Sequence, residues 1–328
     1  MSPAYTTKTH RAPYPRIDPT QPHLSAAGKT VLIVGGSTGI GRATAWAFLA
    51  AGATRLVLTG RREDALATAA AELKKTSNAA AQILTFAVDI TDEAGMERVF
   101  AETEKAFGGN APDIVINCAG APGGSLKPLA TLDGDGFKNW HTPSLPPHRW
   151  TAFEINVRGA AILARLVVRH ASSSSSSPLK TKDREIEAEK AKAPTTTTLI
   201  QLSTAGALFP ANGALPMSAY AASKLAAVKV MEYIGAETDP GVLRVLSVHP
   251  GIFPETEGGG RCSSWSAGNP LFNLPAQFLV WAASHEADFL RNKLVFAAWD
   301  VDELVARKEE IANTPELLIG LNGFPRSL

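Results

Sequence analysis

The sequence predicts a single α/β domain built on a doubly wound parallel β-sheet with helices on both faces. Short, continuous apolar runs recur along the chain, and such runs are typical of strands that are buried on both faces of a parallel sheet. Segments of helical length separate these runs, and regular alternation of strand and helix indicates this fold class. With 328 residues, the chain is long enough to bury the core of one large domain.

The first strand and the first helix are joined by a glycine-rich turn. Residues 30–34 (Thr-Val-Leu-Ile-Val) form an apolar run, Gly-Gly-Ser-Thr-Gly-Ile-Gly occupies positions 35–41, and an alanine-rich helix is expected at 42–51. In this order, backbone amides can approach a phosphate at the positive end of the helix. A turn that serves only tight packing is the alternative. Residues 1–28 carry five prolines and no hydrophobic period, which predicts an extended or disordered arm.

The alternation of strand and helix continues further along the chain. Strands are expected at 55–59, 82–88 and 113–117, and helices at 63–75 and 92–107. The last of these strands leads into the small-residue turn Asn117-Cys-Ala-Gly120. In a Rossmann-type doubly wound sheet, ligands bind at the carboxyl ends of the strands. Asn117 and Gly120 are therefore expected beside a ligand.

Composition and charge exclude several classes of protein. A net charge of +1 gives no reason to expect nucleic acid or a membrane as a partner. The two cysteines, Cys118 and Cys262, are far apart and lack neighbours at metal-ligand spacing, so no metal site is predicted. No apolar run reaches the roughly 20 residues of a membrane-spanning helix, and the N-terminus lacks the apolar core of a signal peptide. We therefore expect a cytoplasmic protein, and this composition leaves a small polar substrate open.

A tyrosine and a lysine are spaced for one helical face. Tyr220 and Lys224 lie four residues apart in an amphipathic segment, residues 217–236, so a helix would bring both side chains to the same side. The reference pKa of tyrosine is about 10, and a neighbouring ammonium group favours the phenolate and lowers that pKa. Such a pair could exchange a proton with a substrate oxygen. Tyr-x-x-x-Lys also recurs by chance on solvated helices, which is the alternative.

Several signals of this kind occur in the order that one family has. Over residues 29–300 the chain resembles the short-chain dehydrogenase/reductase family at Gly35-x-x-x-Gly39-x-Gly41, Asp89, Asn117 to Gly120, Asn156, Ser203, Tyr220-x-x-x-Lys224 and Pro250-Gly251. Val34 and Cys118 stand where the family usually has Thr and Asn, which we interpret as packing changes. Ser203 and Tyr220 are farther apart than is usual, so the loop at 205–216 is expected to reshape the substrate pocket.

The resemblance implies a role for each matching residue. Tyr220 would give a proton to a substrate carbonyl or take one from an alcohol, and Ser203 would orient and polarise that oxygen. Lys224 would hold the nicotinamide ribose and lower the phenol pKa, while Asn156 would position a water molecule between Lys224 and solvent. The residues implied to bind the cofactor are Gly35, Ser37, Thr38, Gly39, Ile40, Gly41, Arg61, Arg62, Asp89, Ile90, Asn117, Ala119, Gly120, Tyr220, Lys224, Pro250, Gly251 and Ile252.

Simpler interpretations stay open for some of these positions. Asn156 and Asp89 could cap or turn the backbone without any contact to a ligand. His249, which precedes Pro250-Gly251, is expected to be a structural residue at the end of a strand and not a catalyst.

The end of the second strand predicts the form of the nicotinamide cofactor. A carboxylate at this point would hold the ribose hydroxyls of NAD, whereas a basic side chain would hold the extra phosphate of NADP. The chain has Gly60-Arg61-Arg62, with no acid, and guanidinium groups match phosphate bidentately. We therefore expect NADP(H). The alternative is that both arginines only begin a solvated helix.

Two insertions and a lid interrupt the predicted domain, which spans 29–305 before a tail at 306–328. Residues 171–197 combine six consecutive serines with alternating lysine and glutamate, which predicts a low-complexity surface loop, and 131–149 is rich in Gly, Pro and His. The segment 252–275 stands where the resembled family has its substrate lid. Its large apolar side chains suit closure over a bulky ligand. These side chains, which could equally belong to the core, are Phe253, Trp265, Leu271, Phe272 and Leu274.

The apolar character of one predicted helix indicates an oligomer. Residues 155–168 are apolar nearly all round, so this helix must be covered on more than one side. In the resembled family this helix and the Tyr-Lys helix commonly form an interface between copies, which implies a homodimer or homotetramer. A monomer whose long loop covers the helix is the alternative.

The combined signals predict an NADPH-dependent carbonyl reductase or, in reverse, an alcohol dehydrogenase. The C-terminal part resembles reductases of fungal secondary metabolism, which implies a bulky apolar or aromatic ketone or alcohol as substrate. Two alternatives remain: a dehydratase, epimerase or isomerase that uses the same tyrosine without net redox, and a non-catalytic NADP-binding scaffold. The complete set of Ser203, Tyr220 and Lys224 favours an enzyme, because binding alone does not require it.

Overall fold

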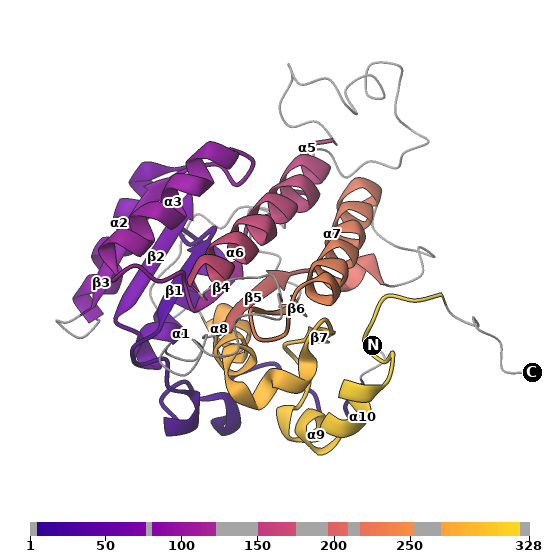
Figure 1. Cartoon of the computed structure of the whole chain (residues 1–328). Helices are drawn as coiled ribbons and strands as arrows, with labels where there is room; N and C mark the ends of the chain where they lie inside the picture. The colour runs from indigo at the N-terminus through magenta and orange to yellow at the C-terminus, as the bar shows by residue number, and fades with distance from the viewer. Residues whose placement is uncertain are drawn as a thin grey trace, which may run out of the picture.

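The computed structural model describes residues 5–76, 81–122, 150–174, 196–208, 217–251 and 270–321. These residues form one seven-stranded parallel sheet in the order β3-β2-β1-β4-β5-β6-β7, with helices on both faces (Figure 1). The strands are β1 (Thr30–Val34), β2 (Arg55–Gly60), β3 (Gln82–Ala87), β4 (Ile114–Asn117), β5 (Thr197–Leu202), β6 (Leu243–His249) and β7 (Leu294–Phe296). The predicted doubly wound sheet is confirmed.

The parallel register brings the carboxyl ends of the central strands to one edge of the sheet. Val34 at the end of β1 pairs with Thr59 of β2 and with Asn117 of β4. Asn117 in turn pairs with Gln201 of β5. Chain segments that are far apart in sequence therefore leave the sheet side by side, which is where a ligand binds in this kind of fold.

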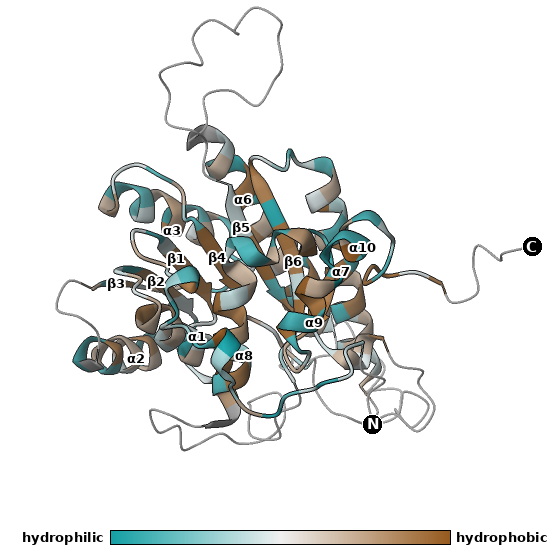
Figure 2. Cartoon of the chain, turned by 90° about the horizontal axis from the view of Figure 1, so that it is seen from below, coloured by the Kyte–Doolittle hydropathy of each residue, from teal (hydrophilic) through white to brown (hydrophobic). Residues whose placement is uncertain are grey.

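Helices cover the sheet in two groups, each with its own hydrophobic core. One core joins the sheet to α1 (Gly39–Ala50), α2 (Glu63–Thr76) and α8 (Pro270–Ala283). The other joins it to α3 (Glu93–Ala106), α6 (Ala160–Ser174) and α7 (Ser218–Glu237). Figure 2 shows the central strands in the hydrophobic colour, with hydrophilic patches on the outer helices. The strands β1, β4 and β5 are buried at every residue because both faces of the sheet are covered there.

α6 is covered largely by its own chain. It follows a short helix, α5 (Trp150–Phe153), and a π-helical turn, Glu154–Gly159. Its apolar side chains are buried against the sheet, and Arg165 and Arg169 on its other side pair with glutamates of α3. The apolar character of this helix is therefore largely satisfied within one chain. The homodimer or homotetramer stays a prediction. The apolar surface of α6 supports it less than the sequence suggested, because the same chain covers most of that surface.

The segment predicted as a lid is in part an ordinary core helix. α8 begins at Pro270, and Phe272 and Leu274 are buried in the first core. Their assignment as lid anchors is therefore wrong, because both side chains pack under the sheet. Residues 252–269, with Phe253 and Trp265, lie outside the described residues, and so does the whole predicted loop at 131–149. Residues 175–195 of the loop predicted at 171–197, and residues 209–216 of the loop predicted at 205–216, also lie outside them.

Residues 5–28, predicted as an extended or a disordered arm, are ordered and packed on the domain, so only the disordered alternative is wrong. This arm contains two short 3-10 helices, Pro15–Ile17 and Pro22–Leu24, whose Ile17 and Leu24 are buried in the core. Thr9 forms an antiparallel bridge with Trp299, just after β7. Proline-rich sequence can be ordered where a neighbouring surface offers apolar contacts and hydrogen bonds.

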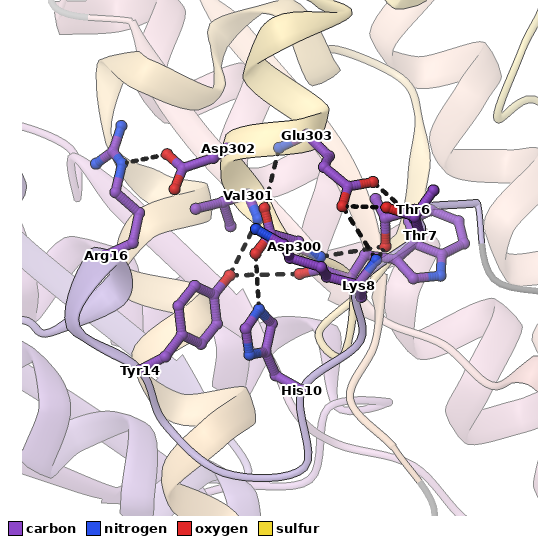
Figure 3. A network of polar contacts seen from close by, with 11 residues as sticks. Thr6, Thr7, Lys8, His10, Tyr14, Arg16, Asp300, Val301, Asp302 and Glu303 are labelled. Atoms are coloured by element: carbon purple, nitrogen blue, oxygen red, sulfur yellow. Dashed lines mark hydrogen bonds and ion pairs between the residues drawn. The ribbon is translucent and has the colours of Figure 1, made fainter.

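A polar network fastens this arm to the start of α9 (Val301–Ala306), as Figure 3 shows. The Glu303 carboxylate accepts hydrogen bonds from the Thr7 backbone at 2.6 Å and from the Lys8 backbone at 3.0 Å. The His10 imidazole contacts the Asp300 carboxylate at 2.8 Å. Tyr14 stacks on His10 and accepts a hydrogen bond from the Val301 amide.

The C-terminal residues also belong to the folded unit. α10 (Lys308–Asn313) buries Ile311, and the Leu294 amide of β7 donates to the Leu317 carbonyl at 2.8 Å. The predicted boundary at residue 305 therefore does not mark the end of the packed structure. In the part of the chain that the structure describes, no helix is both long and apolar enough to cross a lipid bilayer.

Candidate active site

The glycine-rich turn after β1 leaves room where a phosphate would bind. The amides of Gly35 and Gly36 both donate to the Thr59 carbonyl, and Gly35 has a positive φ of 80°. A Cβ on Gly41 would collide with the Gly35 carbonyl, which explains a glycine there. At Gly39, with φ 53°, a Cβ would meet no atom within 4 Å. The open space lies at the first residue of α1, so the turn fits a phosphate-bearing dinucleotide.

The predicted phosphate-binding arginines lie at the neighbouring strand end. Arg61 and Arg62 are exposed directly after Gly60, the last residue of β2. A Cβ on Gly60 would stand 3.3 Å from the Ser37 hydroxyl oxygen, so β2 approaches the glycine-rich turn closely here. Thr38 and Ile40, the other side chains of the turn, flank the start of α1.

Two predicted cofactor contacts have clear structural tasks. The Asp89 carboxylate accepts hydrogen bonds from the amide and the hydroxyl of Thr91, at 2.9 Å and 2.7 Å, which forms a local turn. Ile90 is buried beneath Gly159 of the π-helical turn. Both positions follow β3 at the carboxyl edge of the sheet. At Asp89 the structure shows the backbone turn that the sequence analysis gave as the alternative to a ligand contact.

Asn117 shapes the turn that leaves β4. Its amide nitrogen donates to the Gln201 side chain at 2.8 Å, and its oxygen accepts from the Ala119 amide at 3.1 Å. The backbone of Ala119 in turn packs against Gly35, where a Cβ would stand 3.0 Å from the Ala119 nitrogen. Asn117 therefore joins the ends of β4 and β5 and fixes the backbone at Ala119, against which Gly35 packs.

Asn156 connects the turn after β4 with α7. Its side-chain oxygen accepts from the Ala121 amide at 2.9 Å, and its nitrogen donates to the Ala121 carbonyl and to the Ser223 hydroxyl. Ser223 was not predicted from the sequence, although it stands between Tyr220 and Lys224. The Asn156 amide is fully engaged in these three bonds and is 1% exposed. A structural task is therefore established for Asn156.

Lys224 is a buried amine in the centre of the site. Its Nζ donates to the Leu202 carbonyl at 3.0 Å, and a Cβ on Gly120 would stand 3.1 Å from Nζ. Burial lowers the pKa of Lys224 to about 8. Burial also raises the pKa of the neighbouring Cys118 thiol to about 12, so this thiol stays neutral. Gly120 is thus the residue that leaves the lysine room.

Tyr220 has a different partner from the one that the sequence suggested. Burial raises the pKa of the Tyr220 phenol, and hydrogen bonding with the Thr204 side chain acts in the opposite direction. The expected lowering of this pKa by Lys224 is wrong, because burial raises the pKa and the lysine Nζ donates to the Leu202 carbonyl. Thr204 was missed in the sequence, where only its position next to Ser203 could have signalled it.

Ser203 presents a buried hydroxyl with no hydrogen-bond partner among the described residues. Its backbone amide donates to the Val248 carbonyl at 2.8 Å, which fixes the end of β5 beside β6. Buried hydroxyl groups without a partner are uncommon and mark places where a ligand or water can supply one. His249, Pro250 and Gly251 follow at the end of β6, whereas Ile252 lies outside the described residues.

A separate cavity of about 310 Å³ opens at the opposite edge of the sheet. It is lined by residues such as Lys29, Asp113 and Arg244, which stand at the amino ends of strands. This cavity is therefore far from the carboxyl edge that carries Tyr220 and Ser203. Over the described ranges, no group of three His, Cys, Asp or Glu side chains is arranged to hold a metal ion.

The fold and the site define a dinucleotide-binding α/β protein in which a half-buried tyrosine and a buried serine and lysine lie at the carboxyl edge of the sheet. The sequence pattern of the short chain dehydrogenase family matches residues 29–177. A short chain dehydrogenase/reductase from Claviceps purpurea is 33% identical over 310 residues, which cover 93% of this chain and 90% of that protein. The protein belongs to the short-chain dehydrogenase/reductase family, an oxidoreductase family that uses NAD(P)(H).

Other relatives agree with this assignment. The short chain dehydrogenase/reductase AacuD of Aspergillus aculeatus is 30% identical over 318 residues, covering 96% of both chains. A crystal structure of a short chain dehydrogenase from Mycobacterium smegmatis superimposes with a TM-score of 0.61 at 17% identity, covering 84% of this chain and 93% of that chain. At this identity the structural likeness supports the fold, and the relatives in sequence support the family.

Proposed function

We propose that the protein is an NADPH-dependent carbonyl reductase, or alcohol dehydrogenase in the reverse direction. The observation that carries this proposal is the convergence of the Tyr220 phenol, the Lys224 amine and the unpartnered Ser203 hydroxyl at one edge of the sheet, beside an open glycine-rich turn. A binding protein has no need of a buried lysine and a buried unpartnered hydroxyl, each of which costs stability.

Each side chain has a task in this proposal. The Ser203 hydroxyl would donate to the substrate oxygen and so gain the partner that it lacks. The Tyr220 phenol would give its proton to that oxygen in reduction, with Thr204 holding the phenol in place. Lys224, with a pKa of about 8, would stabilise the phenolate that remains. NADP(H), when bound, would supply or take up the hydride.

The cofactor would be held by the glycine-rich turn and by the strand ends beside it. Gly35, Ser37, Thr38, Gly39, Ile40 and Gly41 would face the phosphates, with Asp89, Ile90, Asn117, Ala119, Gly120, Pro250, Gly251 and Ile252 along the rest of the cleft. We assign NADP(H) over NAD(H) because Arg61 and Arg62 are exposed directly after β2 and the strand itself, Arg55–Gly60, carries no acidic residue.

Fluorescence titration with NADPH and NADH tests the choice of cofactor, because energy transfer from the tryptophans reports both ligands. We expect wild-type protein to prefer NADPH at least tenfold, which corresponds to about 1.4 kcal/mol. Replacing Arg61 and Arg62 by Ser should remove most of this preference. Arg98→Ser, at an exposed arginine of α3, is the matched control and should leave it intact. Equal or tighter binding of NADH by wild-type protein would refute the assignment.

Turnover tests the reaction itself. A panel of bulky apolar and aromatic ketones, incubated with NADPH, should reveal a substrate whose reduction consumes one NADPH per alcohol formed. Tyr220→Phe should lower kcat by roughly 10²–10⁴-fold while NADPH still binds. Product formation without NADPH consumption would favour the dehydratase, epimerase or isomerase alternative. Binding of NADPH without turnover of any carbonyl compound would favour the scaffold alternative.

The substrate class and the setting are part of the same proposal. The fungal origin of the relatives from Claviceps and Aspergillus supports a role in natural-product biosynthesis, with a bulky apolar or aromatic ketone as substrate. We also propose a homodimer or homotetramer in the cytoplasm, by resemblance to the family. Light scattering of the purified protein at several concentrations measures the assembly directly.

A further inference from the structure

β7 is one of the two edge strands of the described sheet, at the end opposite β3. The backbone groups of Lys293 and Ala297 bond to β6, each at 2.9 Å. The amide of Leu294 lies between them along the chain and faces away from β6, because hydrogen-bonding groups alternate in direction along a strand. The outward groups of an edge strand are a template on which another chain can pair. The sheet therefore carries a potential pairing surface at β7.

Segments from both ends of the chain cover this edge. The Leu294 amide donates to the Leu317 carbonyl at 2.8 Å. The His10 amide donates to the Ala298 carbonyl, just after the strand, at 2.7 Å. Residues 10 and 317 thus meet at one strand, although almost the whole sequence separates them. We name the two segments, residues 5–12 and 314–319, the edge cover.

The two parts of the edge cover are bonded to each other. The Tyr5 hydroxyl donates to the Glu316 carboxylate, which also accepts from the Arg307 guanidinium at 2.9 Å. Lys293, directly before β7, donates to the carbonyls of Thr314 and Glu316 at 2.6 Å and 2.9 Å. Because Glu316 joins both parts, we expect displacement of the arm to loosen the C-terminal part as well.

A carboxylate of α9 holds the arm in place (Figure 3). Glu303 accepts from the amide and the hydroxyl of Thr7, each at 2.6 Å, and from the Lys8 amide at 3.0 Å. Hydrogen bonds to an ionised acceptor are about twice as strong as neutral ones. Two of the three donors are backbone amides, so Glu303 fixes the course of the main chain that brings His10 to the edge.

We propose that β7 is a latent pairing surface for a second copy of this chain, and that the edge cover keeps this surface closed. The edge offers one donor, the Leu294 amide, and one acceptor, the Ala298 carbonyl, so it is self-complementary. Two copies related by a two-fold axis could therefore replace the bonds that Leu317 and His10 now make. The homodimer or homotetramer of the proposed function would assemble through other surfaces.

Two double variants separate an open edge from a closed one. Tyr5→Ala with His10→Pro removes the ring and the amide by which the arm binds, whereas Tyr5→Phe with His10→Ala keeps both. Light scattering at rising concentration should give the first variant a mass that approaches twice that of wild-type protein, and the second variant the wild-type mass. A wild-type mass for the opened variant at every concentration would overturn the proposal. Growth into aggregates without a defined mass would also overturn it.

Hydrogen exchange shows whether β7 itself is the pairing surface. At low concentration, the Leu294 amide should exchange about tenfold faster in the opened variant than in the control variant. At high concentration its exchange should slow again, because a second copy then covers it. Exchange as slow as in the control at all concentrations would refute the holding role of the arm. Fast exchange at all concentrations would refute pairing at this strand.

A peptide added in trans gives an independent check. The wild-type peptide of residues 5–12 should return the opened variant to the wild-type mass, and the same peptide with His10→Pro should not. Equal effects of the two peptides would contradict the role of the His10 amide.

A milder variant serves if the double variant does not fold. Thr7→Pro removes only the amide and the hydroxyl that bind Glu303, and it should associate to a smaller degree. A wild-type mass for Thr7→Pro would then overturn the proposal. Because none of these measurements involves turnover, failure of the proposed carbonyl reduction would leave their results as expected.

Discussion

The Nζ of Lys224 donates to the Leu202 carbonyl at 3.0 Å, and this bond ties α7 to the last residue of β5, directly before Ser203. The lysine and the serine of the candidate site are thereby connected through a single peptide unit. Lys224 is only 4% exposed, and no carboxylate among the described residues forms an ion pair or a hydrogen bond with it, so the chain buries this cation without a counter-charge.

The buried amine predicts a particular dependence of stability on pH. The pKa of Lys224 is about 8 in the folded chain and about 10.4 in the unfolded chain, so the folded state binds fewer protons between these values. Wild-type protein should therefore gain stability relative to Lys224→Met as the pH rises through this window. Between pH 8 and 9.5 we expect a relative gain of roughly 1.5 kcal/mol in the free energy of unfolding.

Urea unfolding of both cofactor-free proteins at pH 7, 8 and 9.5 measures this difference. At pH 7 the lysine is charged in both states, so the difference between the two proteins should be constant below that pH. If their unfolding free energies run parallel up to pH 9.5, the amine is not held at a lowered pKa.

Thr204 should tune the acidity of Tyr220. Hydrogen bonding with the threonine side chain lowers the phenol pKa against the effect of burial, so Thr204→Val should raise that pKa. The limb of the pH–kcat profile that follows deprotonation of the tyrosine should then move to higher pH. Thr204→Ser, which keeps a hydroxyl, should leave the limb in place. A limb that is the same in all three proteins would show that Thr204 does not act on Tyr220.

Asn156 should be as important for stability as for turnover. Asn156→Leu has nearly the same volume but leaves the amide and the carbonyl of Ala121 without their partner. We expect it to lower the free energy of unfolding by about 2–4 kcal/mol, since each buried polar group that loses its partner costs about 1–3 kcal/mol. Ser223→Ala removes the third bond together with the bond from the Ser223 hydroxyl to the Tyr220 carbonyl, and it should cost less, about 1–2 kcal/mol. Equal losses in the two variants would contradict this ranking, which thermal or chemical unfolding measures.

The N-terminal arm should contribute to the stability of the whole domain. Tyr5 packs between Trp299 and the Arg307 guanidinium, so Tyr5→Ala should lower the free energy of unfolding by about 1–2 kcal/mol. Tyr5→Phe keeps the ring and loses only the hydroxyl contact with Glu316, so its effect should be smaller. Differential scanning calorimetry compares the two. An unchanged Tm in Tyr5→Ala would mean that the arm rests on the domain without stabilising it.

Local patterns explain why much of the fold was predictable. The apolar run at 30–34 became β1 with the same bounds, because a strand buried on both faces needs apolar residues at every position. The glycine-rich turn that follows was also predictable from the sequence. Its glycines are required by the positive φ of Gly35 and Gly39 and by the lack of room for a Cβ at Gly41, all within one short segment. The tyrosine and the lysine were assigned to one helix by their spacing alone, and α7 contains both.

The partners of the same residues were not predictable. The sequence suggested that Lys224 acts on Tyr220, whereas the structure pairs Lys224 with the Leu202 carbonyl and Tyr220 with Thr204. The sequence could not decide whether Phe272 and Leu274 belong to the core or to a substrate lid, because an apolar side chain suits both positions. The sequence by itself determined the strands, the turn and the set of reactive side chains, since each depends on near neighbours along the chain. Only the tertiary structure decided which atoms meet and that the N-terminal arm packs beside Trp299 and the start of α9, because those contacts join residues that are far apart in sequence.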